Sequence, residues 1–227
     1  MPFLLIGIFA VVVIGLIILG LYQAAKRRKE LLAWAGSKGL SFSQAKDRGM
    51  ESRFPQFKAL KQGSNRYAFN IIEGDWSERP IIAFDYHYET HSTDSKGRRQ
   101  THHHRFSAVI LGSDLPLKPL FIRPEGFFDK VTEFFGLDDI DFESAEFSRK
   151  FYVKAEDKRW AYDVIHTRTM QFLLDMPQYT IEFSPSHVIV YRSSTFKTTQ
   201  FEEAIAVITG ILDRFPDYLV KQLRGEG

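Results

Sequence analysis

The chain opens with an unbroken apolar run from Phe3 to Leu21, and the first charges after it form the basic cluster Lys26 to Lys29. About 20 apolar residues are needed for a helix to cross a hydrocarbon core roughly 30 Å thick. The run lacks the short apolar region and small-residue cleavage site of a secretory signal peptide. The pattern therefore predicts a transmembrane signal-anchor over residues 1–25, in a single-pass protein.

The basic cluster gives this anchor an orientation. Because Lys and Arg accumulate on the cytoplasmic side of a transmembrane helix, we expect the N-terminus outside and the soluble domain in the cytoplasm of a cell membrane protein. Anionic lipid attracts cations next to a membrane-spanning segment. We therefore expect the cluster to lie near lipid headgroups; its members are Lys26, Arg27, Arg28 and Lys29.

Residues 26–65 form the next segment, which we expect to be a juxtamembrane helix and a connector. Apolar residues recur at roughly helical spacing over 27–42, so a helix continues from the membrane. The following residues show little periodicity up to Pro55 and beyond.

Extended segments dominate the first part of the remaining chain, 66–227. Residues 84–89 alternate between aromatic and polar side chains, as in a half-buried strand. Because a polar loop (92–99) separates this segment from the apolar-alternating run 103–111, the two should form an antiparallel hairpin. Aromatic and β-branched enrichment predicts the strands 66–74, 79–90, 103–111, 120–123, 179–183 and 187–191.

Helical patterns follow later in the chain. We expect helices over 126–136, after Asp157 and Thr167 as N-caps, and from a capping box of Thr199 with Glu202. Residues 138–143 and 146–153 are expected to be extended. Antiparallel strands with separate helices predict an α+β domain built on one mostly antiparallel sheet with packed helices.

Composition narrows the function. Of 30 Lys+Arg and 28 Asp+Glu, four cations belong to the basic cluster, so the rest of the chain carries 26 against 28. This balance argues against a nucleic-acid partner, which requires a basic surface. The absence of cysteine excludes disulfides, thiolate nucleophiles and cysteine-based metal sites, and is compatible with the cytoplasm.

Histidines provide the chemical candidate. If Tyr86 pairs with Phe106, the polar side chains project to the other face of the hairpin, where imidazole and carboxylate groups could bind zinc or another divalent metal. The candidate ligands are His87, Glu89, His91 and His103. A solvated polar face explains the same pattern without a metal. Alternation of Asp139, Asp141 and Glu143 permits a cation site or, again, a solvated strand.

Several strings resemble an uncharacterised family of bacterial single-pass membrane-anchored proteins, a domain of unknown function. They are AWAGSKGLSF (33–42), FDYHYET (84–90), FIRPEG (121–126), DIDFESAEFSRKF (139–151) and KRWAYDVI (158–165). The resemblance implies no activity, cofactor or catalytic residue.

Common catalytic and phosphate-binding motifs are also absent from the sequence. We therefore predict a membrane-anchored cytoplasmic binding or scaffold module with no catalytic residue or cofactor, whose partner is a protein or a lipid headgroup. A metal-dependent hydrolase that uses the hairpin histidines is the alternative.

Overall fold

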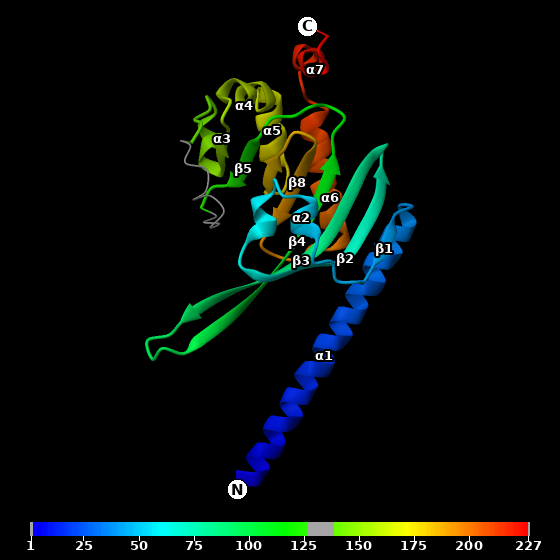
Figure 1. Ribbon diagram of the computed structural model, residues 1–227, viewed down its shortest axis with the longest axis vertical. Coiled ribbons are helices and arrows are strands. Elements are labelled where there is room, and N and C mark those ends of the chain that lie inside the picture. The colour runs from blue at the N-terminus through cyan, green and yellow to red at the C-terminus, as the bar shows by residue number, and fades with distance from the viewer. Residues whose placement is uncertain (1, 127–138, 227) are drawn as a thin grey trace.

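A computed structural model describes residues 2–126 and 139–226. Figure 1 shows a long N-terminal helix that leads into a sheet with helices packed against it. The helices are α1 (Pro2–Ser37), α2 (Met50–Arg53), η1 (Lys58–Lys61), α3 (Ala145–Lys150), α4 (Lys158–Val164), α5 (Thr167–Asp175), α6 (Thr198–Leu212) and α7 (Asp217–Arg224). The strands are β1 (Ser41–Ser43), β2 (Ser64–Trp76), β3 (Arg79–Thr93), β4 (Arg99–Gly112), β5 (Leu120–Pro124), β6 (Phe151–Lys154), β7 (Thr180–Phe183) and β8 (His187–Arg192).

The strands form a single eight-stranded sheet in the order β1-β2-β3-β4-β8-β7-β5-β6. Every strand pair in the described residues is antiparallel, so the predicted α+β class with one mostly antiparallel sheet is confirmed. Tyr86 pairs with Phe106, which is the condition on which the placement of the histidines depended. β3 and β4 form a hairpin whose outer part projects beyond the rest of the sheet (Figure 1).

Apolar side chains on both faces of the sheet are buried. One face packs against α1, α6 and the other large helices, and the other face packs against the short α2 and η1. The two faces alternate along β3, where Ala83 belongs to the first cluster and Phe84 to the second. This period of two explains why the sequence pattern located the strand well.

The second half of α1 is part of the core. Leu31, Trp34 and Ala35 are buried, and the Trp34 ring stacks on Phe201 of α6 with the ring centroids 5.6 Å apart. The Trp34 Nε1–H donates to Glu202 Oε1 at 2.8 Å. One continuous helix therefore carries the exposed apolar run at its start and core side chains at its end.

Some local predictions were wrong. The expected capping box of Thr199 and Glu202 does not form, because α6 begins at Thr198 and Glu202 accepts hydrogen bonds from Trp34 and Lys38. The backbone N–H of Lys197 instead donates to Gln200 Oε1 at 2.8 Å. Tertiary contacts thus determine the role of this glutamate.

The prediction of an extended segment over 146–153 is wrong for its first part, which is helical, and correct from Phe151 onward. Ser144 caps α3 by accepting from the N–H of Phe147, and the strand β6 begins only at Phe151. Residues 139–143 belong to no strand, so the carboxylate alternation is not displayed on a sheet; Asp139 Oδ1 accepts from the N–H groups of Ile140 and Val153. The helix expected over 126–136 lies almost wholly outside the described residues.

Candidate functional site: the polar face of the hairpin

One face of β3 carries a row of polar side chains. Residues at odd positions from Ile81 onward share the face that packs on α1 and α6, and beyond Ala83 this face turns polar at Asp85, His87 and Glu89. Cross-strand neighbours on β4 are Ser107 opposite Asp85 and His103 opposite Glu89. The strand register therefore brings ionisable groups of β3 and β4 together.

Three of the four predicted metal ligands converge. His87 Nε2 lies 3.2 Å from His103 Nδ1, and His103 Nδ1 lies 3.3 Å from Glu89 Oε1. The three potential ligand atoms all lie within 4.8 Å of one another. We call His87, Glu89 and His103 the histidine cluster. His87 is buried and the His103 side chain is 62% exposed, so the cluster opens to solvent on one side.

The fourth predicted ligand, His91, lies further along the hairpin. Its Nδ1 is 3.1 Å from Thr101 Oγ1 and its Nε2 is 3.1 Å from Ser64 Oγ, so both ring nitrogens have hydroxyl partners. His102 and His104 face the opposite side, where they contact Ser92 and Thr90. Strand alternation thus separates three consecutive histidines and brings His103 alone to the cluster.

Asn65 of β2 contacts two members of the histidine cluster. Its backbone oxygen lies 3.1 Å from His87 Nδ1, and its side-chain amide donates to Glu89 Oε1 at 2.6 Å. Asn65 has φ +48° and sits at a register shift between β2 and β3, which is typical of a β-bulge. The Tyr67 ring stacks on the His87 ring with centroids 4.6 Å apart. The His87 ring is therefore positioned by the backbone oxygen of Asn65 and by the Tyr67 ring, and the Glu89 carboxylate is positioned by the amide of Asn65.

Electrostatics favour a neutral imidazole beside an ionised carboxylate. Desolvation by burial lowers the pKa of His87, and the nearby positive charge of Arg105 acts in the same direction. The hydrogen bond from Asn65 is the main cause that lowers the pKa of Glu89. At neutral pH these groups present lone pairs rather than protons to the space between them.

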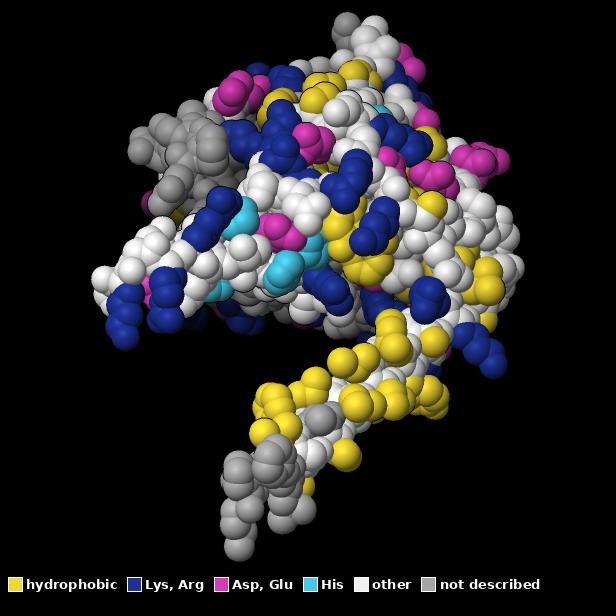
Figure 2. All heavy atoms as spheres, turned by 60° about the horizontal axis from the view of Figure 1, so that its bottom comes forward, with side chains coloured by type: hydrophobic (Ala, Val, Ile, Leu, Met, Phe, Trp, Pro, Cys, Tyr) yellow, Lys and Arg dark blue, Asp and Glu magenta, His cyan; other side chains and the backbone are white. Residues whose placement is uncertain are grey.

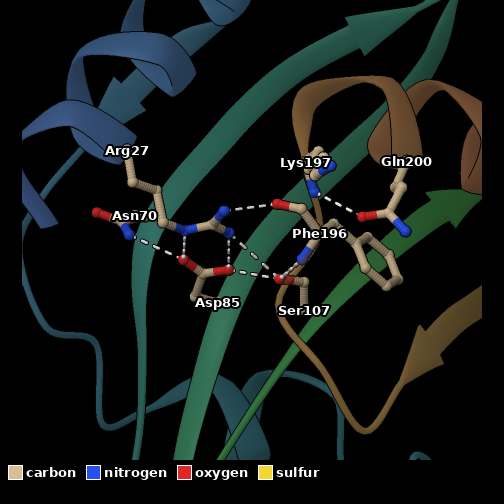
Figure 3. Close-up of polar contacts among 7 residues, drawn as sticks. All are labelled: Arg27, Asn70, Asp85, Ser107, Phe196, Lys197 and Gln200. Carbon is tan, nitrogen blue, oxygen red and sulfur yellow. Dashed lines mark hydrogen bonds and ion pairs between the residues drawn. The ribbon is translucent and has the colours of Figure 1, made fainter. Parts of the chain in front are cut away.

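Nearer the domain centre, the same face of β3 holds an ion pair that the sequence did not reveal. Arg27 of α1 contacts the buried Asp85 carboxylate through Nε at 3.0 Å and Nη2 at 2.6 Å (Figure 3). Its Nη1 also donates to the carbonyl oxygen of Phe196 at 2.6 Å. The same two carboxylate oxygens also accept hydrogen bonds, Oδ2 from Asn70 at 2.8 Å and Oδ1 from Ser107 at 2.5 Å. This network fastens α1 to the sheet.

The four residues of the basic cluster therefore differ in their surroundings. Arg27 points to Asp85, whereas Lys26, Arg28 and Lys29 are exposed. Arg28 donates to Gln44 at 3.1 Å. Their proximity to lipid stays a prediction.

The first half of α1 has the properties of a membrane span. Within the described residues, α1 alone is long and apolar enough to cross a membrane, over Ile6–Ser37, as judged by length and composition. Its most apolar stretch makes no buried contact with the domain. Figure 2 shows hydrophobic side chains around this projecting helix, with Lys and Arg gathered where it meets the domain.

Comparison with known proteins supports the fold. No family model matches the chain, and no curated protein matches it in sequence. Among solved structures, the chain is similar to the mycobacterial trehalose monomycolate transport factor A, TtfA, with a TM-score of 0.56 and 13% sequence identity. The match covers 83% of this chain and 96% of that one. At this identity the likeness establishes a shared fold.

Proposed function

We propose that this protein is a non-catalytic binding module that α1 holds at the cytoplasmic surface of a membrane. The observation that carries the proposal is the continuity of α1. Its first half is apolar and exposed, and its second half contributes buried side chains to the domain core. The ion pair of Arg27 with Asp85 lies between these halves. A tether fixed in this way presents one side of the domain to the bilayer.

The partner that best fits this side is a surface of anionic lipid headgroups. Figure 1 shows the β3–β4 hairpin and the apolar half of α1 extending from the same end of the domain, with α7 at the opposite end. The hairpin tip carries Lys96, Arg98 and Arg99, all exposed, against Asp94. Each cation near an anionic membrane contributes about 1 kcal/mol of attraction. Together with Lys26, Arg28 and Lys29, the tip would form a second contact with the bilayer that α1 spans.

The named role of the structural neighbour agrees with this proposal. That protein is described as a transport factor for trehalose monomycolate. A role in transport is compatible with the binding module that we propose for this chain.

The orientation is testable because the chain contains no cysteine. We expect a single cysteine introduced at the hairpin tip, at the exposed Ser95 (Ser95→Cys), to react with a membrane-impermeant maleimide only after the cells are lysed. The control is Pro2→Cys, which we expect to react in intact cells because the basic cluster predicts an outside N-terminus. Labelling of Ser95→Cys in intact cells would contradict the cytoplasmic placement.

The headgroup contact predicts a dependence on lipid charge. With a fluorophore on Ser95→Cys and the full chain in vesicles, we expect energy transfer to headgroup-labelled lipid to rise when phosphatidylserine is added to phosphatidylcholine. Lys96→Glu with Arg99→Glu should abolish this rise because two of the three cations of the tip become anions. The control pair Lys221→Glu with Arg224→Glu lies on α7, at the other end of the domain, and should change nothing.

The headgroup proposal fails if energy transfer is the same in both lipids and is unaffected by the tip variants. The hairpin tip would then be assigned to binding of a protein partner.

A metal-dependent hydrolase is the second candidate, favoured by the donor set of the histidine cluster. Two imidazoles and one carboxylate with an open side match the ligand sets of catalytic zinc sites. Hydrolase activity against ester and phosphoester substrates that increases with added zinc, and disappears in His87→Ala, would favour it over the binding module.

A further inference from the structure

We infer that the histidine cluster is a zinc site that links β3 and β4 at the base of the projecting hairpin, with one coordination position left open. This inference goes beyond the binding module proposed above. It shares its ligands with the second candidate function but requires no hydrolase activity. The ligand atoms are His87 Nε2, Glu89 Oε1 and His103 Nδ1.

Two of the three distances among the ligand atoms suit a tetrahedral zinc ion. Zinc lies about 2.0–2.2 Å from nitrogen and oxygen ligands, which places adjacent ligand atoms of a tetrahedron about 3.3–3.6 Å apart. The separations of His103 Nδ1 from His87 Nε2 and from Glu89 Oε1, 3.2 Å and 3.3 Å, are close to this spacing. The remaining pair, His87 Nε2 and Glu89 Oε1, lies within 4.8 Å, so two of the three separations already match the tetrahedral spacing.

The surrounding hydrogen bonds fix the tautomer that a metal needs. Because the backbone oxygen of Asn65 can only accept, the Nδ1 of neutral His87 must carry the proton, and Nε2 keeps its lone pair. The side-chain amide of Asn65 also donates a hydrogen bond to Glu89 Oε1 and so orients this carboxylate. Metal-binding histidines and carboxylates are oriented by outer partners of this kind. Asn65 performs this role for two of the three ligands.

The cluster has more acceptors than it has protons. His87 Nε2 and Glu89 Oε1 both accept, and a neutral His103 can offer a single proton from Nδ1 to these two partners. A divalent cation would accept a lone pair from each of the three ligand atoms at once. The exposed side of His103 gives the ion a route from solvent.

Zinc is the metal class that this donor set fits best. Imidazole and carboxylate ligands at tetrahedral spacing suit zinc. Calcium and magnesium prefer sites made of oxygen ligands, whereas two of the three ligands here are imidazole nitrogens. A bound ion would join β3 to β4 and, through Asn65, to β2. It would therefore stiffen the hairpin where it leaves the body of the sheet.

Titration of the metal-stripped full chain with zinc, in detergent and without a histidine tag, tests the inference. We expect one zinc ion to bind per chain by calorimetry and to raise the unfolding temperature. His87→Ala and His103→Ala should weaken binding at least 100-fold. The matched controls His91→Ala and His102→Ala lie on the same hairpin and should bind as the original chain does.

Two milder variants keep the test informative if an alanine variant fails to fold. Glu89→Gln preserves the shape and the acceptor for Asn65 while it removes the charge. Asn65→Gly keeps the left-handed backbone and the carbonyl oxygen opposite His87, but removes the amide; loss of an outer partner typically weakens metal binding 10–100-fold. Zinc binding that is absent, or that the control variants remove while His87→Ala and His103→Ala retain it, would overturn the inference.

Discussion

Replacing Arg27 with methionine is expected to lower the free energy of unfolding of the domain by about 3–5 kcal/mol, the usual cost of removing one partner of a buried ion pair. The Asp85 side chain is 1% exposed, so without the guanidinium its charge would stay in a poorly solvated position. Asn70 and Ser107 would still donate to it, but neither supplies a positive charge. Methionine keeps the unbranched, apolar part of the arginine side chain, so loss of packing contributes little.

Denaturant unfolding in detergent micelles, followed by tryptophan fluorescence, measures this effect because Trp34 and Trp160 are buried reporters. Lys26→Met is the matched control, since the Lys26 side chain is 64% exposed and its contact with Glu30 is 4.0 Å long. It should change the free energy by less than about 1 kcal/mol, as exposed pairs do. Equal effects of the two substitutions would show that the Asp85 contact does not stabilise the domain.

The double variant Arg27→Met with Asp85→Asn separates the ion pair from the hydrogen bonds around it. Removing both charges eliminates the unpaired carboxylate, so the double variant should be more stable than Arg27→Met alone. This recovery would identify the buried charge of Asp85 as the cause of the loss.

The sequence predicted the hairpin well because its information is local. Alternation of polar and apolar residues over 84–89 specifies which side chains share a face, and the opposite apolar row fixes the register of Tyr86 with Phe106. From this register the convergence of His87, Glu89 and His103 follows. His91 lies further out on the same face, where its ring nitrogens are near the hydroxyl groups of Ser64 and Thr101, a distance that alternation alone does not specify.

The contacts that span the chain could not be predicted in this way. Arg27 and Asp85 are 58 positions apart, and in the sequence Arg27 is indistinguishable from the three other cations of its cluster. Asn65 and Asn70 follow a rule that is visible only in the structure. Each has positive φ at a register shift of β2, and each donates its amide to an acidic residue of β3. Two asparagines within one predicted strand could have suggested β-bulges. They could not have shown which acidic residues of β3 the two amides contact.

Arginine at two positions of the apolar run, Ile14→Arg with Ile17→Arg, is expected to release the protein from the membrane. Each arginine at the centre of a spanning helix costs about 2.5–3.5 kcal/mol, so the pair costs roughly 5–7 kcal/mol, enough to shift an insertion equilibrium by more than about a thousandfold. Both side chains are 56% exposed, and the stretch around them makes no buried contact with the domain, so the folded domain should be unaffected.

Carbonate extraction of membranes measures the loss, and circular dichroism of the released protein shows whether the domain is still folded. The matched control is Leu32→Arg, which is 53% exposed on the domain half of the same helix and should leave the protein in the membrane fraction. Retention of the double variant in that fraction would mean that the helix still spans the membrane, and would contradict the prediction. Because the two arginines lie far from the contact of Arg27 with Asp85, release of a folded domain would show that the apolar half of α1 supplies the attachment.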